Sequence, residues 1–197
     1  MTPMNAIMSR IITVQYYSMK KLLSFSGSFS ADSINHQLVV YTSSLIKNAD
    51  LSIIRLTDFE APIYRNELEM ESGVPINIKK LRLLFDEADA FIVSTPEYNG
   101  SIPAGLKNTM DWLSRTGGKI FQDKPVLLMA TSPGGRGGQT VLGHLSTVVP
   151  FWGAELVDTF SLPSFHQNLV DGKMDEKYDI ELQSALRKLE EALTKTR

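Results

Sequence analysis

Short apolar runs alternate with amphipathic stretches along most of this chain, and the alternation restricts the folds that it can adopt. Apolar and β-branched residues gather in five runs of the length of buried strands, at residues 22–26, 51–56, 90–95, 126–130 and 156–162. Between the first two runs, Ile34, Leu38 and Tyr41 recur at helical spacing. Strands separated by helices predict an α/β fold, with a doubly wound parallel sheet and helices on both of its faces.

The other helical stretches follow the same pattern and leave one long connection. Helices are predicted over residues 81–88, 104–114, 141–152 and 182–193. The segment from Asp58 to Gly73 is acidic in its second half and is predicted to be a loop, longer than the usual connection. No repeat or low-complexity tract divides the pattern, so residues 19–197 are expected to form one domain.

Residues 1–18 do not continue the alternation. Arg10 interrupts a moderately apolar segment and no small-residue cleavage site follows, so a signal peptide is not predicted. Met19, Lys20 and Lys21 directly precede the first strand and have the character of a natural start. We therefore expect residues 1–18 to be a poorly ordered N-terminal extension, and an additional edge strand is the alternative.

The composition argues against several classes of function. A net charge of −2 provides no basic surface for nucleic acid, and the absence of cysteine excludes disulfides, thiolate metal sites and cysteine nucleophiles. None of His36, His144 and His166 is followed by a second metal ligand four residues later, so no metal site is predicted. No run approaches the roughly 20 apolar residues of a membrane helix. A cytoplasmic protein without membrane or nucleic-acid partners is expected.

The loop that follows the third strand, from Pro96 to Pro103, is the most informative one. Its two prolines make it stiff, and Gly100 allows a ligand to come close to the backbone. A solvated connection has no need of Tyr98 between a glutamate and an asparagine, although core packing of the tyrosine is the alternative. Loops at the carboxyl ends of parallel strands are where open α/β sheets bind ligands.

A serine-rich loop follows the first strand, from Ser26 to Asn35. It offers four serine hydroxyls and the free N–H groups of a helix start, which together suit a phosphate monoester. Ordinary capping of the helix by Asp32 or Ser33 is the alternative. The loop is not a Walker loop, because no Gly-Lys-Ser/Thr sequence follows.

The loop after the fourth strand, from Ser132 to Gly138, contains four glycines in seven residues. So many glycines predict close approach of the backbone to a flat ring or to a neighbouring subunit, and a mobile hinge is the alternative. In a sheet of order 2-1-3-4-5 the first and third strands flank the point where ligands bind. Phosphate on the serine loop, a planar heterocycle on Pro96–Gly100 and the glycine loop across the ring correspond to bound flavin mononucleotide (FMN).

The same stretches resemble the NADPH-dependent FMN reductases of flavodoxin-like fold, a family with many quinone and azo-dye reductases. The resemblance runs from about Lys20 to Trp152. It depends on the motifs Gly27-Ser28 with Ser33 and Asn35, Thr95-Pro96-Glu97-Tyr98-Asn99-Gly100-Ser101-Ile102-Pro103, Leu106-Lys107-Asn108 with Asp111-Trp112, and Ser132-Pro133-Gly134-Gly135. It implies a homodimer or homotetramer that binds FMN and takes hydride from NADPH or NADH.

The resemblance also implies which residues bind the cofactor. The serine loop would hold the phosphate, Pro96 to Gly100 the isoalloxazine, and the glycine loop would close the site. The candidate cofactor-binding residues are Ser26, Ser28, Ser33, Ile34, Asn35, Pro96, Glu97, Tyr98, Asn99, Gly100, Ser132, Gly134 and Gly135. Tyr98 and Asn99 would shape the open ring face, and no protein residue is assigned a catalytic proton transfer.

One position departs from the family pattern. Members usually carry an arginine two residues after the Ser28 position, where this chain has Ser30. A hydrogen bond to a charged group contributes roughly 1.5–3 kcal/mol, so its loss predicts FMN binding weaker by about tenfold or more. Replacing Ser30 by arginine is expected to tighten FMN binding, unless another cation of the protein already binds the phosphate.

The expected reaction is hydride transfer from NADPH or NADH through N5 of FMN to a quinone, azo compound, flavin or metal oxyanion. Because both substrates would use the same ring face, ping-pong kinetics are expected. A flavin-binding electron carrier or redox-responsive regulatory module is the alternative, although such carriers tend to be more acidic than this chain. A serine hydrolase has little support, because no Gly-x-Ser-x-Gly elbow is present.

Overall fold

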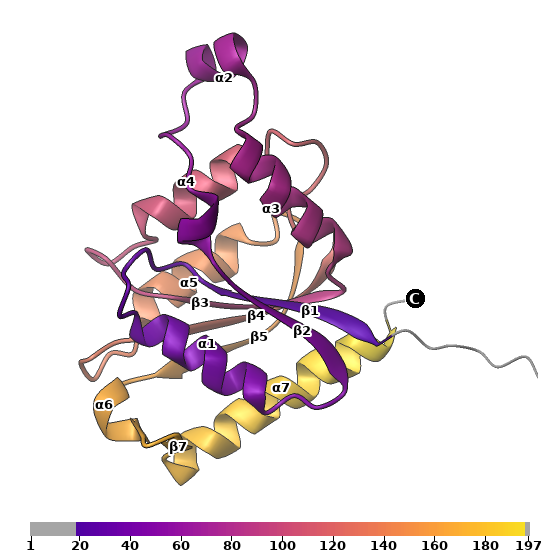
Figure 1. Cartoon of the computed structure of the whole chain (residues 1–197). Helices are drawn as coiled ribbons and strands as arrows, with labels where there is room; N and C mark the ends of the chain where they lie inside the picture. Colours follow the sequence, from indigo (N-terminus) through magenta and orange to yellow (C-terminus); the bar gives the residue numbers. More distant parts are fainter. Residues whose placement is uncertain (1–18, 196–197) are drawn as a thin grey trace, which may run out of the picture.

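A five-stranded parallel sheet forms the centre of the protein in this computed structural model, which describes residues 19–195 (Figure 1). The strands are β1 (Lys20–Ser26), β2 (Ala49–Arg55), β3 (Ala90–Thr95), β4 (Lys124–Thr131) and β5 (Ala154–Leu162). Their order, β2-β1-β3-β4-β5, confirms the predicted flavodoxin-like sheet. The predictions made for residues 1–18 lie outside the described residues.

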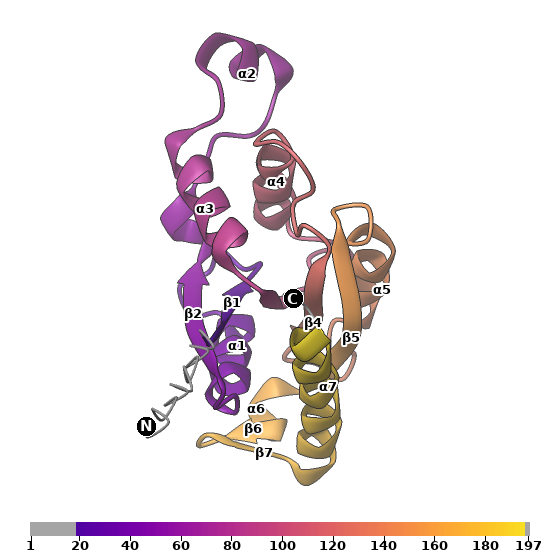
Figure 2. The same cartoon turned by 90° about the vertical axis from the view of Figure 1, so that its right-hand side faces the viewer.

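Helices cover both faces of the sheet (Figures 1 and 2). One face carries α3 (Ile76–Glu87), α4 (Ala104–Leu113) and α5 (Gln139–Val148), and the other carries α1 (Ile34–Ser44) and α7 (Glu176–Lys195). Successive side chains of a strand point to opposite faces, so Leu22 packs in the α1–α7 core while Leu23 packs in the core of α3, α4 and α5. Both faces are apolar because both are covered.

The segment predicted as a long loop contains two short helical elements, η1 (Leu56–Phe59) and α2 (Asn66–Ser72), and α2 projects from one end of the molecule (Figures 1 and 2). The loop prediction is therefore wrong over α2. No residue of α2 is buried, so no apolar periodicity marks it in the sequence. Arg115 holds it instead, since its Nε donates to both carboxylate oxygens of Glu69 at 3.0 and 2.9 Å. Gly73, at φ 70°, ends the helix.

The helix predicted to reach Trp152 ends four residues earlier, at Val148. Pro150 has no N–H to continue the helical ladder, and Gly153, at φ 80°, completes the turn into β5. Trp152 still packs against the core, and its carbonyl accepts a hydrogen bond from the Phe121 N–H at 3.0 Å. Before α7 the chain also forms α6 (Phe165–Asn168) and a hairpin of β6 (Leu169–Val170) and β7 (Lys173–Met174), which are too short to show a periodic pattern.

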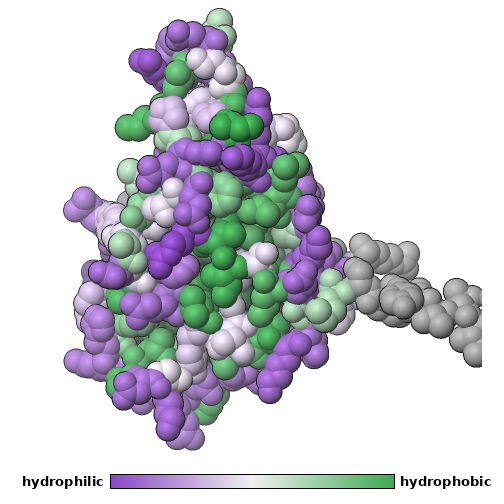
Figure 3. Space-filling view, viewed as in Figure 1, coloured by the Kyte–Doolittle hydropathy of each residue, from purple (hydrophilic) through white to green (hydrophobic). Residues whose placement is uncertain are grey.

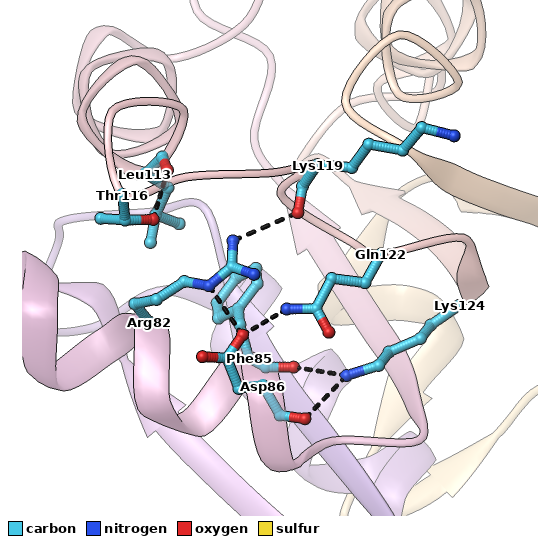
Figure 4. A network of polar contacts seen from close by, with 8 residues as sticks. All are labelled: Arg82, Phe85, Asp86, Leu113, Thr116, Lys119, Gln122 and Lys124. Carbon is cyan, nitrogen blue, oxygen red and sulfur yellow. Dashed lines mark hydrogen bonds and ion pairs between the residues drawn. The ribbon is translucent and has the colours of Figure 1, made fainter.

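A polar network joins α3 to the start of β4, at the amino ends of the strands (Figure 4). The Lys124 Nζ donates to the carbonyls of Phe85 and Asp86 at 2.8 and 2.9 Å. The carboxylate of Asp86 accepts from Arg82 Nε at 2.7 Å and from the side-chain amide of Gln122. Burial lowers the pKa of Lys124. Among residues 19–195, no helix is long and apolar enough to cross a membrane.

Candidate functional site

The three loops that the sequence singles out meet at the carboxyl edge of the sheet. They follow β1, β3 and β4, which are adjacent strands, so their starting points lie side by side. The Gly27 N–H, just after β1, donates to the carbonyl of Ser94 in β3 at 2.8 Å. The sheet therefore brings together loops that are about 70 and 35 residues apart in sequence.

The serines of the first loop organise its backbone. Ser26 Oγ accepts from the Ser28 N–H at 3.1 Å, and Ser28 Oγ accepts from the Ser30 N–H at 3.2 Å. Ser33 is the N-cap of α1, and its hydroxyl accepts from the His36 N–H at 3.2 Å. The predicted capping by Ser33 is thus present, and it is compatible with anion binding, because a helix start has more free N–H groups than one cap satisfies.

Asn35 has a structural task that the sequence does not reveal. Its side chain is 1% exposed, and its Oδ1 accepts from Ser94 Oγ at 2.8 Å and from the Thr131 N–H at 3.0 Å. Its Nδ2 donates to the Thr131 carbonyl at 3.0 Å. The amide therefore ties α1 to the ends of β3 and β4. At the helix start the backbone N–H groups of Ile34 and Asn35 have no acceptor within the helix, so they remain available to an anion.

The Pro96–Gly100 loop contains a tight two-residue turn. Tyr98 and Ser101 exchange backbone hydrogen bonds at 3.2 and 3.0 Å, and Asn99 and Gly100 between them have φ values of 52° and 73°. Positive φ at both central positions is typical of a type I′ turn, for which Asn-Gly is the preferred pair. The turn leaves Tyr98 48% exposed, so this tyrosine does not pack in the core of the described chain.

Glu97 connects this loop to the glycine loop. Its Oε2 accepts from the N–H groups of Thr140 and Val141, at 2.9 and 3.1 Å, in the first turn of α5. The N-cap position of α5 is Gly138, which has no side chain to cap the helix. A carboxylate from a distant loop therefore satisfies these donors and interacts favourably with the helix dipole.

Hydrogen bonds to neighbouring segments hold the glycine loop. Ser132 Oγ donates to the Gly134 carbonyl at 2.9 Å and accepts from the Gly137 N–H at 3.0 Å. The Gly134 carbonyl also accepts from the Ser164 N–H at 2.9 Å, and Ser161 Oγ donates to the Gly137 carbonyl at 2.9 Å. The Phe165 N–H also donates to the Ser132 carbonyl, at 3.0 Å. These five hydrogen bonds favour a loop of fixed shape over a mobile hinge.

The glycines at this edge fall into two groups, which test the fit of a flat ligand. A Cβ on Gly27 would lie 2.7 Å from a Leu106 methyl, so packing inside the chain explains that glycine. A Cβ on Gly100, Gly134 or Gly135 would meet no atom within 4 Å. Open space beside these three loop glycines, of which Gly134 and Gly135 are exposed and Gly100 is half-buried, suits a planar ring lying on main chain, and the residues present therefore fit FMN.

Two cavities of the described chain lie beside these loops. One of about 530 Å³ lies between the glycine loop, β5 and α7, and it contacts the candidate site only through Gly135. Another of about 180 Å³ lies between Phe29 and the start of α4. Neither is assigned to the flavin, because neither is lined by both the serine loop and the Pro96–Gly100 loop. Among residues 19–195 no group of three His, Cys, Asp or Glu side chains could hold a metal ion.

One residue near the site is absent from the sequence-based set. Arg55, the last residue of β2, donates from Nη1 to the carbonyl of Ala31 in the serine loop at 3.2 Å. The two residues are 24 positions apart, and no motif links them. The signal that could have found Arg55 is the missing cation at Ser30, which calls for a positive charge from another element.

Comparison with known proteins agrees with this geometry. The family model of NADPH-dependent FMN reductases matches residues 20–167. A quinone reductase of Escherichia coli K12 is 31% identical over 156 residues, which cover 79% of this chain and 81% of the relative. An NAD(P)H-dependent FMN reductase of Pseudomonas aeruginosa is 33% identical over 132 residues, covering 66% of this chain and 70% of the relative.

A solved structure extends the similarity over nearly the whole chain. The flavoenzyme NAD(P)H:(acceptor) oxidoreductase of Paracoccus denitrificans superposes with a TM-score of 0.74 at 26% identity, covering 90% of this chain and 99% of that one. The resemblance inferred from the loop motifs is confirmed, as are the oxidoreductase class, FMN as cofactor and a reduced nicotinamide nucleotide as co-substrate. With its three loops, its sheet order and these relatives, the chain belongs to the NADPH-dependent FMN reductase family.

Proposed function

We propose that this chain transfers hydride from NADPH or NADH, through FMN, to a small acceptor of the quinone type. The observation that carries the proposal is the meeting of a hydroxyl-rich helix start, a stiff Tyr-Asn-Gly turn and an open glycine loop at one edge of the sheet. These supply a place for the phosphate, a main-chain surface for the ring and space for the ring itself.

The serine loop would bind the phosphate. The hydroxyls of Ser26 and Ser28 fix the loop by accepting from the N–H groups of Ser28 and Ser30, and Ser33 caps α1. Ile34 and Asn35 would donate their backbone N–H groups to the phosphate. The positive end of the α1 dipole also attracts an anion at this position. The Asn35 side chain would act indirectly, by keeping the helix start in register with the sheet.

The other two loops would hold the ring. Pro96 to Gly100 would present main chain to it, and Ser132, Gly134 and Gly135 would close its far side. When bound, FMN accepts and donates a hydride at N5, which is the chemistry of the cofactor. Glu97 is committed to the α5 donors, so no proton transfer is assigned to it. Tyr98 and Asn99, both exposed, would shape the open ring face.

The acceptor class is proposed from the relatives, which include a protein named quinone reductase. A quinone fits an open, flat site because it can stack on the ring face that the nicotinamide has left. Because the nicotinamide nucleotide and the acceptor would occupy the same ring face one after the other, ping-pong kinetics are expected. Azo compounds, free flavin and metal oxyanions remain further acceptors to be compared in the same assay.

The first experiment measures FMN binding and turnover by the purified protein. Saturating FMN is expected to raise the melting temperature and to have its fluorescence quenched, and NADPH is expected to be oxidised when benzoquinone is supplied. Parallel lines in double-reciprocal plots at several benzoquinone concentrations would support the ping-pong order. An unchanged melting temperature with unquenched FMN fluorescence would refute the proposed function.

A second experiment tests the space beside the glycine loop. Gly135→Val places side-chain atoms where the free chain has none within 4 Å, so the melting temperature of the apoprotein is expected to be unchanged while FMN binding weakens at least tenfold. Gly143→Val is the control, because a Cβ on Gly143 also meets no atom within 4 Å but lies on α5. Equal FMN affinity in both variants would contradict the proposed ring position.

An electron carrier or regulatory module without efficient turnover is the alternative function. It also requires FMN binding, so the same assay separates the two: flavin binding without NADPH-dependent quinone reduction would favour the carrier. The proposed reaction consumes NADPH or NADH, which the cytoplasm supplies, and we propose that compartment for the protein. We also propose that the protein is a homodimer or homotetramer.

A further inference from the structure

The serine loop carries no positive side chain of its own. Residues 27–33 contain a single charged group, the carboxylate of Asp32. A phosphate monoester has a charge of about −1.5 to −2 at neutral pH. Hydroxyls and backbone N–H groups alone would therefore have to hold it close to a like charge. A cation contributed by another element would offset this repulsion.

Arg55 brings such a cation to the loop. It is the last residue of β2 and pairs in register with Ser26, the last residue of β1. Its guanidinium reaches the loop, where Nη1 donates to the Ala31 carbonyl at 3.2 Å. Its charge also acts on His36 in the first turn of α1: burial and, second, Arg55 lower the pKa of that imidazole. Arg55 is thus close to both the loop and the helix start.

The guanidinium keeps capacity for a ligand. The bond to Ala31 uses one of its five N–H donors, and the Arg55 side chain is exposed. The planar fork of an arginine matches two phosphate oxygens at once. We propose that Arg55 supplies the positive charge that binds the phosphate of FMN in this chain. This inference rests on the proposed function, since it assumes that FMN occupies the site.

The test compares FMN with riboflavin, which has the same ring but no phosphate. Arg55→Gln is expected to raise the Kd for FMN by about tenfold or more and to leave the Kd for riboflavin unchanged. Arg55→Lys, which keeps the charge but loses the fork, is expected to fall between wild type and Arg55→Gln. Arg187→Gln, at an exposed arginine of α7, is the control and is expected to bind both ligands as the wild type does.

A gain of charge gives the reciprocal test. Ser30→Arg in the Arg55→Gln background places a cation within the loop and is expected to restore FMN binding. FMN affinity is also expected to fall with salt more steeply in wild type than in Arg55→Gln, because one ionic contact is lost. Melting temperatures of the apoproteins verify that each variant is folded.

The outcomes separate this inference from the proposed function. If wild type binds FMN and Arg55→Gln binds it equally tightly, the role of Arg55 is refuted while the proposed function stands. Equal weakening of FMN and riboflavin would also refute it, because the effect would then not concern the phosphate. If wild type itself binds no FMN, the proposed function fails, and the role assigned to Arg55 fails with it.

Discussion

Asn35 illustrates how a single side chain can join a cofactor loop to the sheet. The motif predicts it as a phosphate ligand, yet its amide makes three hydrogen bonds to Ser94 and Thr131 at the ends of β3 and β4. Those strands lead into the other two loops of the site. The position of the helix start relative to the ring-binding loops therefore depends on one buried amide.

Asn35→Ala is expected to reduce the free energy of unfolding by about 2–4 kcal/mol, because it leaves buried donors and acceptors without partners. Gln37→Ala, at an exposed position of the same helix, is expected to change stability by no more than about 0.5 kcal/mol. Urea denaturation of both apoproteins measures the difference. Equal stability of the two variants would show that the three bonds of Asn35 contribute nothing.

His36 predicts a pH dependence of stability. Its Nδ1 is buried and has no hydrogen-bond partner among the described residues, and burial, followed by the charge of Arg55, lowers its pKa below the ordinary value of 6.5. Above pH 6.5 the imidazole of His36 is neutral in both the folded and the unfolded chain, so the stability of the protein is not reduced by its protonation. As the pH falls through 6.5, the unfolded chain takes up a proton that the folded chain refuses, so stability declines.

Substitution of His36 isolates this contribution. In His36→Gln the decline of the free energy of unfolding between pH 7 and pH 5.5 is expected to be smaller than in wild type. His144→Gln is the control, because His144 is exposed, and it is expected to keep the wild-type slope. A slope in His36→Gln as steep as in wild type would assign the acid sensitivity to other groups.

At the scale of elements, Lys124 joins a helix end to the sheet. Its Nζ donates to the carbonyls of Phe85 and Asp86 in the last turn of α3, where no N–H of the helix is available to pair with them (Figure 4). Lys124→Met is expected to destabilise the protein by about 1–3 kcal/mol. Lys119→Met is the control, since the ion pair of Lys119 with Asp123 is exposed and contributes at most about 1 kcal/mol. Thermal unfolding of the two variants should differ by several degrees.

The elements that the sequence predicted correctly are those with a buried face. β3 and β4 are apolar because they are covered on both sides, and α7 places Leu182, Leu186 and Leu189 in the core. The elements that it missed are short, and α2 among them has no buried residue. This helix depends on the pair of Glu69 and Arg115, which lie 46 positions apart. Local periodicity carries no information on such a contact.

The whole molecule exposes apolar surface that an assembly would cover. The α2 segment projects from the molecule, and Ile63 and Met70 there are 83% and 80% exposed. A short helix without buried residues gains little stability from its own backbone. Hydrophobic residues also gather over the centre of the face in Figure 3. Exposed apolar side chains of the described chain include Val40 of α1, Ile53 of β2 and Leu83 of α3.

Sedimentation velocity is therefore expected to show a dimer or tetramer. Ile63→Glu combined with Met70→Glu is expected to shift the population towards the monomer, since charges in a buried contact would be unpaired. Ile180→Glu, at a 61% exposed position of α7, is the control and is expected to leave the mass unchanged. A wild-type protein that sediments as a monomer at all concentrations would contradict the proposed assembly.

The order of apolar runs determined the fold class, and the Tyr-Asn-Gly and serine motifs identified the loops that form the candidate site. Both are local patterns, because burial and turn geometry restrict which residues can occur at neighbouring positions of the chain. Only the tertiary structure decided that Asn35 bonds to the strand ends, that Glu97 caps α5 and that Arg55 reaches the serine loop. Each of these contacts joins residues far apart in sequence, and the parallel sheet alone brings them within hydrogen-bonding distance.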